Sequence, residues 1–460
     1  MPLPNRQRRA VSVAARVAGL AAALLAAGCR SKAPPPRNVI LIVVDTLRAD
    51  HLGVYGYPRD TSPNFDALAR GAALFTNARS QASCTYPSVN SILTSRYPAA
   101  FFGQPDDAMG IPAAIPSLAD ILHSRGFHTV AISASPIVRR HWSRFNPKGG
   151  YDRGFEVFDE QCLWKSADCM TAAALPHLHS DPARPLFLYL HYLDPHGPYS
   201  PPARLREFAT GPTDKDFIRR GDPNPIADHL YKGGPDPHVT ADDLRYLVGL
   251  YDDEIAYFDD QLGKLLRAID AAGLRDDTLL VLAADHGEEF LEHGNVKHCH
   301  SLYDALVHTP LVVRVPGTVP HPRITAPVEN LDIVPTILDY LRLPAPPSGL
   351  AGRSLRAAIE GGPAPEAPVY QRSAQGSLRS IADGRFKLIH DLDSRGFQLF
   401  DLAHDAGETR DVLAEHRREL HGLRATLAAW LAAAEGDAAS AGVRKSVEAD
   451  RRLRSLGYLD

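Results

Sequence analysis

The stretch Val39-Ile40-Leu41-Ile42-Val43-Val44, which ends at Asp45, decides the fold class of this 460-residue chain. Six consecutive aliphatic residues are typical of a strand buried on both faces, as in the parallel sheet of an α/β protein. Three more apolar runs follow, at residues 186–190, 278–282 and 311–315. The sequence therefore predicts an α/β domain built on a largely parallel sheet.

Helical patterns fill the intervals between these runs. Ser62-Pro63-Asn64 precedes a helix predicted over residues 65–71, with proline near its first turn. Residues 242–269 carry apolar side chains at helical spacing with charges between them. After the proline-rich residues 344–347, the pattern changes to short antiparallel strands over 377–401 and a helix over 415–434. We expect a large domain over residues 38–355 and a smaller C-terminal α+β subdomain over 356–460.

Composition excludes few classes of protein. Hydrophobic residues make up 44% and charged residues 23%, which is the balance of a globular protein. The formal net charge is −4, so the total charge gives no indication of a nucleic-acid partner.

The first thirty residues have the features of an export signal. Arg6, Arg8, Arg9 and Arg16 form a basic segment, followed by an apolar run over 17–27 that is too short to span a bilayer. Residues 25–29 (LAAGC) resemble a bacterial lipobox, in which Cys29 would be lipidated. We expect a signal peptide of lipoprotein type over 1–29, a tether over 30–37, export to the cell envelope or periplasm, and membrane attachment through Cys29. The alternative is a cleaved signal with a chance cysteine.

Four cysteines remain, and their pairing cannot be read from sequence. Cys162 and Cys169 are close enough to close a small loop disulfide in an oxidising compartment. Cys84 and Cys299 are compatible with buried apolar side chains, a disulfide or redox-sensitive groups.

Polar residues follow three of the four apolar runs. Asp45 ends the first, His191 and His196 follow the second, and Asp285-His286 follow the third. Ligand sites of open α/β sheets lie beyond the carboxyl ends of the strands. Two carboxylates and an imidazole from separate strands are able to bind one divalent cation, although an aspartate after a strand is more often a turn or capping residue.

Thr85 begins a predicted helix that has Pro87 near its start. A hydroxyl at a helix N-terminus lies at the positive end of the helix dipole, which stabilises an alkoxide and a bound anion. A metal on the same oxygen would lower its proton affinity further. The simpler interpretation of Thr85 is a helix cap.

Together these segments resemble the sulfatase family of the alkaline phosphatase superfamily, in the same order from about Asn38 to the C-terminus. The matching stretches are Asn38 to Asp50, Leu52-Gly53, Tyr55-Gly56, Thr61 to Asn64, Pro87-Ser88, Leu93-Thr94, Tyr97-Pro98, Asp194-Pro195-His196, Tyr199, Tyr251-Asp252, Glu254-Ile255, Asp285 to Glu288, Glu292-His293-Gly294, Pro310-Leu311, Asp332, Pro335-Thr336 and Leu456-Gly457-Tyr458. The resemblance implies an alkaline-phosphatase-like fold for residues 38–355 and a metal-dependent catalytic activity.

It also implies roles for matched positions. The cation would bind to Asp45, Asp285, His286 and the nucleophile, which is the residue two before Pro87, namely Thr85. His196 would contact the substrate anion or protonate the leaving group, and Arg48 would stabilise anionic charge. A lysine or histidine after the Asp-His pair contacts the anion in this family. We expect His298 in this role, with His300 and Lys297 as alternatives. For His293, the alternative to a role in the site is to order its loop.

The chain departs from the family pattern at the nucleophile. Sulfatases proper carry a cysteine within Cys-x-Pro-Ser-Arg and oxidise it to formylglycine. Here Thr85 stands in register, Cys84 is one residue too early, and Val89 replaces the arginine. The usual Asp-Asp pair is Asp45-Thr46. Threonine with an Asp-His pair resembles lipoteichoic acid synthases and phosphoethanolamine transferases.

The sequence thus predicts a hydrolase, or a transferase, of sulfate or phosphate esters that forms a covalent intermediate on Thr85. One divalent metal ion (Mn, Mg, Ca or Zn) is expected, with an anionic ester of an envelope or environmental glycan or lipid as substrate. The alternatives are a formylglycine sulfatase using Cys84 and a non-catalytic anion-binding envelope protein. Specificity is expected in the loops at 161–179 and 204–238.

Overall fold

The computed structural model describes residues 34–101, 110–141, 146, 149–164, 166–179, 183–317, 322–374 and 376–434. The predicted signal peptide, Cys29 and the terminal Leu456-Gly457-Tyr458 motif lie outside these residues. Within the described part of the chain, no helix is both long and apolar enough to cross a bilayer.

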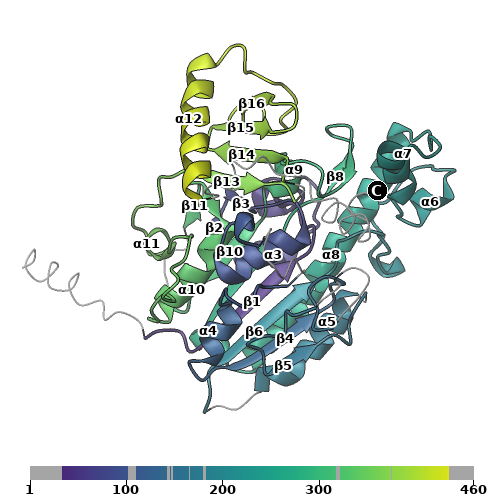
Figure 1. Cartoon of the computed structure of the whole chain (residues 1–460). Helices are drawn as coiled ribbons and strands as arrows, with labels where there is room; N and C mark the ends of the chain where they lie inside the picture. Colours follow the sequence, from purple (N-terminus) through teal and green to yellow (C-terminus); the bar gives the residue numbers. More distant parts are fainter. Residues whose placement is uncertain are drawn as a thin grey trace, which may run out of the picture. The chain divides into compact units, whose positions relative to one another are not determined.

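The centre of the fold is an eight-stranded sheet with the order β11-β2-β10-β7-β1-β6-β4-β5 (Figure 1). β1 pairs in parallel with β6 and β7, and β4 and β5 continue the parallel part. β10 is antiparallel to both β7 and β2. The predicted mostly parallel sheet is confirmed. The fourth apolar run of the sequence, at residues 311–315, forms the antiparallel strand β10. The strand bounds are β1 Asn38–Val44, β2 Ala73–Phe75, β4 His128–Ser133, β5 Val157–Asp159, β6 Leu186–Tyr192, β7 Thr278–Ala284, β10 Leu311–Arg314 and β11 Arg323–Ile324.

Helices cover both faces of this sheet, which explains why β1 is apolar from Val39 to Val44. Ile40, Ile42 and Val44 belong to the core layer beneath α2, α5 and α8. The intervening residues of β1 belong to the layer beneath α3, α4 and α10. The helix bounds are α2 Pro63–Arg70, α3 Thr85–Thr94, α4 Leu118–His123, α5 Ala167–Ala174, α8 Ala241–Ala271 and α10 Ile333–Tyr340.

The ends of the three central strands lie at the same level. Val44 is in register with Tyr192 of β6 and with Ala284 of β7. The amide of Asp45 donates to the carbonyl of Tyr192, and the amide of Asp285 donates to the carbonyl of Val44. The first residues after β1 and β7 are therefore held side by side by the sheet itself.

A smaller antiparallel sheet, β13-β14-β15-β16, forms the C-terminal part with α12 packed against it. This confirms the predicted C-terminal architecture, with the helix beginning two residues later than expected. Its elements are β13 Val369–Arg372, β14 Leu378–Ala382, β15 Phe386–Asp391, β16 Phe397–Asp401 and α12 Arg417–Ala434. Shorter elements are β3 Ala78–Arg79, β8 Glu289–Phe290, β9 Val296–Lys297, β12 Val328–Glu329, α6 Asp216–Arg219, α7 Asn224–Lys232, α9 Asp304–Val307 and α11 Arg356–Ile359.

A buried ion network joins the two sheets. Lys387 of β15 is fully buried and donates to carboxylates of Asp304, at 2.7 Å, and Glu408, at 2.9 Å. Arg79 of β3 donates through two nitrogens to the same Asp304. The C-terminal sheet is thus attached to the main domain by charges that are largely buried.

Candidate active site

Three side chains at the ends of β1 and β7 form a compact group. Asp45, Asp285 and His286 are all buried, and one ligand atom from each lies within 4.8 Å of the others. Nε2 of His286 is 3.6 Å from the nearest oxygen of each carboxylate. The group comes from residues 240 positions apart, which the strand register alone brings together.

The donor atoms of this group fit a divalent cation. Oδ1 of Asp45 and Oδ2 of Asp285 are buried and have no hydrogen-bond partner. Burial raises the pKa of both carboxyls, and the neighbouring charge of Asp45 adds to the shift of Asp285, whose pKa is raised to about 6. Nδ1 of His286 donates to the carbonyl of Gly287 at 2.9 Å, so Nε2 offers its lone pair to the group.

Thr85 is the first residue of α3 and is almost completely buried beside the same group. Its Oγ1 lies 3.2 Å from Nε2 of His286. The hydroxyl is therefore at a helix N-terminus and next to the imidazole of His286 at once. A capping role alone does not account for this position.

His191 is a member of the site to which the sequence assigned no role. Its Nε2 is buried, has no hydrogen-bond partner and lies 3.7 Å from Oδ2 of Asp45, while Nδ1 is 2.9 Å from the hydroxyl of Tyr189. Burial lowers the pKa of His191 to about 4, so the ring is neutral. The available signal was a histidine inside an otherwise apolar strand, in register with Val43 of β1.

Thr46 occupies the position of the expected second carboxylate and orders the site through its backbone. Its φ is +55°, a left-handed conformation that is uncommon for a threonine. In this conformation its amide donates to Oδ1 of Asp285, and its carbonyl accepts from the Tyr251 hydroxyl at 2.7 Å. Thr46 therefore fixes Asp285 without adding a charge.

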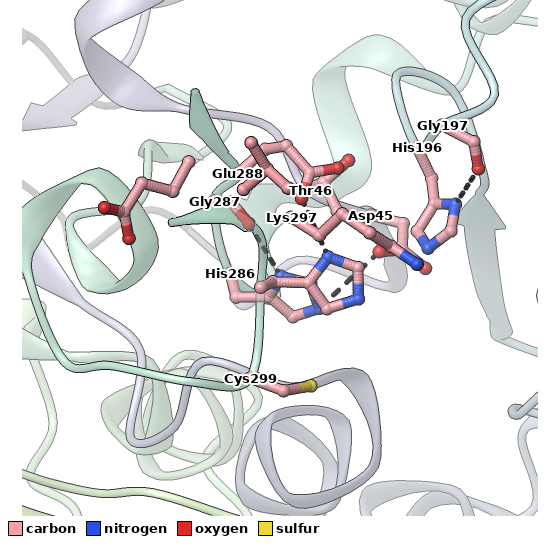
Figure 2. A network of polar contacts seen from close by, with 12 residues as sticks. Asp45, Thr46, His196, Gly197, His286, Gly287, Glu288, Lys297 and Cys299 are labelled. Carbon is pink, nitrogen blue, oxygen red and sulfur yellow. Dashed lines mark hydrogen bonds and ion pairs between the residues drawn. The ribbon is translucent and has the colours of Figure 1, made fainter. Parts of the chain in front are cut away.

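Two further histidines, His196 and His298, lie near the candidate metal-binding group of Asp45, Asp285 and His286. Figure 2 shows His196. The His298 ring is 4.5 Å from that of His286 and 5.2 Å from that of His196, measured between centroids. Nδ1 of His298 pairs with Oε1 of Glu288 at 2.9 Å, and Nδ1 of His196 donates to the carbonyl of Gly197 at 2.6 Å. Burial lowers the pKa of both imidazoles.

Glu288 is a second residue to which the sequence gave no role beyond its motif. It is buried, holds His298 through Oε1, and accepts from the Tyr199 hydroxyl through Oε2 at 3.1 Å. Its place directly after the Asp-His-Gly motif was the only signal.

The other predicted site residues have contacts elsewhere. The guanidinium of Arg48 binds both carboxylate oxygens of Asp50, the carboxylate of Glu292 and the carbonyl of Glu288. The remaining three lie in the same loop region. There Lys297 donates to Asn224, whereas His293 and His300 both contact Glu289.

The four cysteines of the described residues form two disulfides, Cys84–Cys299 and Cys162–Cys169. The second is the small loop closure that the sequence suggested. The first links residues 215 positions apart and resolves the open alternatives for Cys84 and Cys299.

Comparisons with known proteins agree with this geometry. Residues 37–343 match the family model "Sulfatase", and residues 291–434 match "N-sulphoglucosamine sulphohydrolase, C-terminal". The chain is 27% identical over 361 residues to an ulvan-active sulfatase of Formosa agariphila, covering 73% of this chain and 67% of the relative. It is 22% identical over 442 residues to a Δ4,5-hexuronate-2-O-sulfatase of Bacteroides thetaiotaomicron, covering 85% and 89%.

Solved structures show the same fold. A 2-O GAG sulfatase superposes with a TM-score of 0.72 at 19% identity, covering 90% of this chain and 96% of that one. A phosphonate monoester hydrolase of Agrobacterium radiobacter superposes with a TM-score of 0.67 at 24% identity, covering 85% and 96%. The alkaline-phosphatase-like fold predicted from the sequence is confirmed. The chain belongs to the sulfatase family of ester hydrolases.

Proposed function

We propose that this chain is a metal-dependent hydrolase of sulfate or phosphate esters that forms its covalent intermediate on Thr85. One observation carries the proposal: Oγ1 of Thr85, at the start of α3, lies 3.2 Å from Nε2 of His286, which is itself 3.6 Å from each of two buried carboxylates. A hydroxyl in these surroundings is activated as a nucleophile.

Asp45, Asp285, His286 and Thr85 would hold one divalent cation. Oxygen-rich ligands with a single imidazole suit Mn²⁺ or Mg²⁺ slightly better than Zn²⁺, and they are also compatible with Ca²⁺. When bound, the cation would supply positive charge that lowers the proton affinity of the Thr85 hydroxyl and offsets the charge of the substrate. Nε2 of His191 lies 3.7 Å from Oδ2 of Asp45 and faces that carboxylate without a hydrogen bond to it.

The reaction has two halves. In the first, Oγ1 of Thr85 bonds to the sulfur or phosphorus atom as the bond from that atom to the ester oxygen breaks. The Thr85 proton passes to solvent, and the leaving oxygen takes a proton from the cationic form of His196 or His298, which the negative charge of the bound ester favours. In the second, water attacks the same atom, one of its protons returns to Thr85 and the other to the histidine, and inorganic sulfate or phosphate leaves. An acceptor alcohol in place of water would make the enzyme a transferase.

His298 is favoured over His300 and Lys297 as the downstream anion contact. Its ring lies between those of His286 and His196, whereas His300 pairs with Glu289 at 2.7 Å. In this proposal Arg48 does not contact the substrate anion, because its guanidinium is already bound to two carboxylates. Only its positive charge acts on the anion, through space.

The two alternatives have less support. A formylglycine at position 84 requires a free cysteine there, and the sulfur of Cys84 is bonded to Cys299. A non-catalytic anion-binding protein leaves the placement of Thr85 and of two histidines around the metal-binding group unexplained.

The substrate is proposed to be an anionic ester of a glycan, met in the cell envelope. The relatives named above are sulfatases of ulvan and of a hexuronate, and the Arg-rich N-terminal segment with Cys29 suggests export and a lipid anchor. The decisive experiment is a panel of aryl sulfate, phosphate monoester, phosphate diester and phosphonate substrates, each with Mn²⁺, Mg²⁺, Ca²⁺ or Zn²⁺. Metal binding without turnover of any ester would reject the proposal.

A further inference from the structure

The geometry points to the Cys84–Cys299 disulfide as a positioning element that aligns the nucleophile with the proton donor; this inference rests on the roles proposed for Thr85 and His298. Cys84 directly precedes Thr85, and Cys299 directly follows His298. One covalent bond therefore joins the two backbone segments that carry the reacting side chains. Both cysteines are buried, at 2% and 1% exposure, so the bond lies inside the protein.

The disulfide is reinforced by the backbone. The amide of Cys299 donates to the carbonyl of Ser83 at 2.9 Å, so the two segments are tied at two adjacent points. Figure 2 shows Cys299 below His286 in this view. A shift of the loop after β9 would therefore move the start of α3 with it.

Position 84 is an unusual place for a cysteine unless its side chain is needed. Cys84 is the N-cap residue of α3, a position where serine, threonine, aspartate or asparagine usually bonds to the helix amides. The side chain of Cys84 makes no such capping hydrogen bond. The N-cap residue that precedes Thr85 therefore lacks the usual hydrogen bond to the helix amides. The disulfide holds the N-terminal end of α3 in its place.

Position 299 gives an independent argument. Cys299 has φ of +79° and Lys297 has φ of +68°, so left-handed residues stand on both sides of His298. Glycine adopts this conformation without strain, whereas a residue with a side chain does so at a cost. A cysteine retained at such a position indicates that its sulfur is needed.

Three of the four residues proposed to hold the cation lie apart from the disulfide, and the fourth, Thr85, adjoins it. Asp45, Asp285 and His286 are fixed by the ends of β1 and β7. Loss of the disulfide should therefore misalign Thr85 and His298 while the cation still binds. The chain also offers a matched control, because Cys162–Cys169 closes a short loop at the start of α5.

The test compares three double variants for kcat, KM, bound metal and melting temperature. Cys84→Ala/Cys299→Ala should lower kcat by roughly 10- to 100-fold, the loss caused by about 1 Å of misplacement, with KM and metal content close to wild type. Cys84→Ala/Cys299→Gly should melt higher than the alanine pair, because glycine relieves the left-handed strain, yet have an equally low kcat. Cys162→Ala/Cys169→Ala should keep the kcat of the wild type.

Two results would overturn the inference: wild-type kcat in the alanine pair, or recovery of kcat in the glycine pair. Recovery with glycine would mean that the alanine pair acts through strain alone. Thr85→Ala is measured in parallel. If Thr85→Ala is active, the proposed function itself fails; if it is inactive while the alanine pair is fully active, only the positioning role fails.

Discussion

The hydroxyl oxygen of Thr85 lies 3.2 Å from Nε2 of His286, although 201 residues separate the two in the sequence. Thr85 is brought there by α3, and His286 by the end of β7. The relationship makes the hydroxyl and the imidazole of the candidate metal-binding group parts of one site, and the first prediction below depends on it.

Replacement of Thr85 tests the nucleophile. Thr85→Ala should lower kcat by at least about 10³-fold, or roughly 4 kcal/mol of barrier, because the attacking oxygen is gone. Thr85→Ser restores that oxygen and should recover much of the activity. Mass spectrometry should find the trapped substrate adduct on Thr85 and Cys84 in its disulfide with Cys299, without conversion to formylglycine. Formylglycine at position 84, or a fully active Thr85→Ala enzyme, would return the chain to the ordinary sulfatase mechanism.

Removal of the cation should destroy both activity and part of the stability. Asp45 and Asp285 bring two buried carboxylates together, and a cation bound only by the folded state stabilises it by mass action. Chelation should therefore abolish turnover and lower the melting temperature. Asp285→Asn should bind less metal, and its melting temperature should respond little to chelation. An untreated enzyme in which elemental analysis finds no metal, yet which turns over normally, would contradict the site.

The buried network between the sheets predicts a large loss of stability on removal of one charge. Lys387→Met leaves Asp304 and Glu408 without their shared partner and should reduce the free energy of unfolding by about 3–5 kcal/mol. Lys264→Met removes an exposed pair with Asp260 and should change it by less than about 1 kcal/mol. Chemical denaturation measures both. Equal effects of the two variants would show that the network contributes no more than a surface pair.

Glu329 should make the protein less stable as pH rises. Burial, with the nearby Asp332, raises the pKa of Glu329 to about 8, against 4.5 for an ordinary glutamate. Between these two values the folded chain keeps a proton that the unfolded chain has released, so the free energy of unfolding falls with pH and levels off above about 8.

Glu329→Gln removes this proton exchange and should flatten the pH dependence, leaving the part due to Asp332. The amide oxygen of glutamine can still accept from the backbone of Tyr370, and its NH₂ can donate to the hydroxyl of Tyr97. Unfolding in denaturant at about pH 5 and about pH 8 measures the slope. Glu366→Gln, at an exposed position, serves as the control. A variant with the same slope as wild type would exclude Glu329 as its source.

Export and anchoring are tested at Cys29. A lipidated Cys29 should send the mature protein into the detergent phase and take up labelled palmitate, whereas Cys29→Ser should release it in water-soluble form. A protein recovered from the cytosol with Met1 still attached would contradict export and anchoring together.

The sequence was most informative where chemistry and regular structure coincide. The apolar run before Asp45 predicts both a doubly covered strand and a polar site at its end, and the two follow from one physical cause. Thr85, Asp285 and His286 were found in the same way, since each stands at the boundary of a helix or strand.

The remaining features of the site depend on contacts that no local pattern encodes. His191 takes part because the register of β1 and β6 places it beside Asp45, and Glu288 because it holds the ring of His298. The Cys84–Cys299 pairing is set by the approach of two distant loops. Arg48 was predicted near the substrate anion, but it binds the carboxylates of Asp50 and Glu292. No spacing in the sequence indicates that these carboxylates occupy its guanidinium.

The strand register has a consequence for the order of events during folding. Asp45 and Asp285 meet only after β1 has paired with β7, a contact between segments about 240 residues apart whose loop closure carries a large entropic cost. The chain must therefore form most of its central sheet before any cation finds its ligands. Helix content and the fluorescence of buried aromatic side chains should recover early in refolding, and metal uptake should follow as the last kinetic phase.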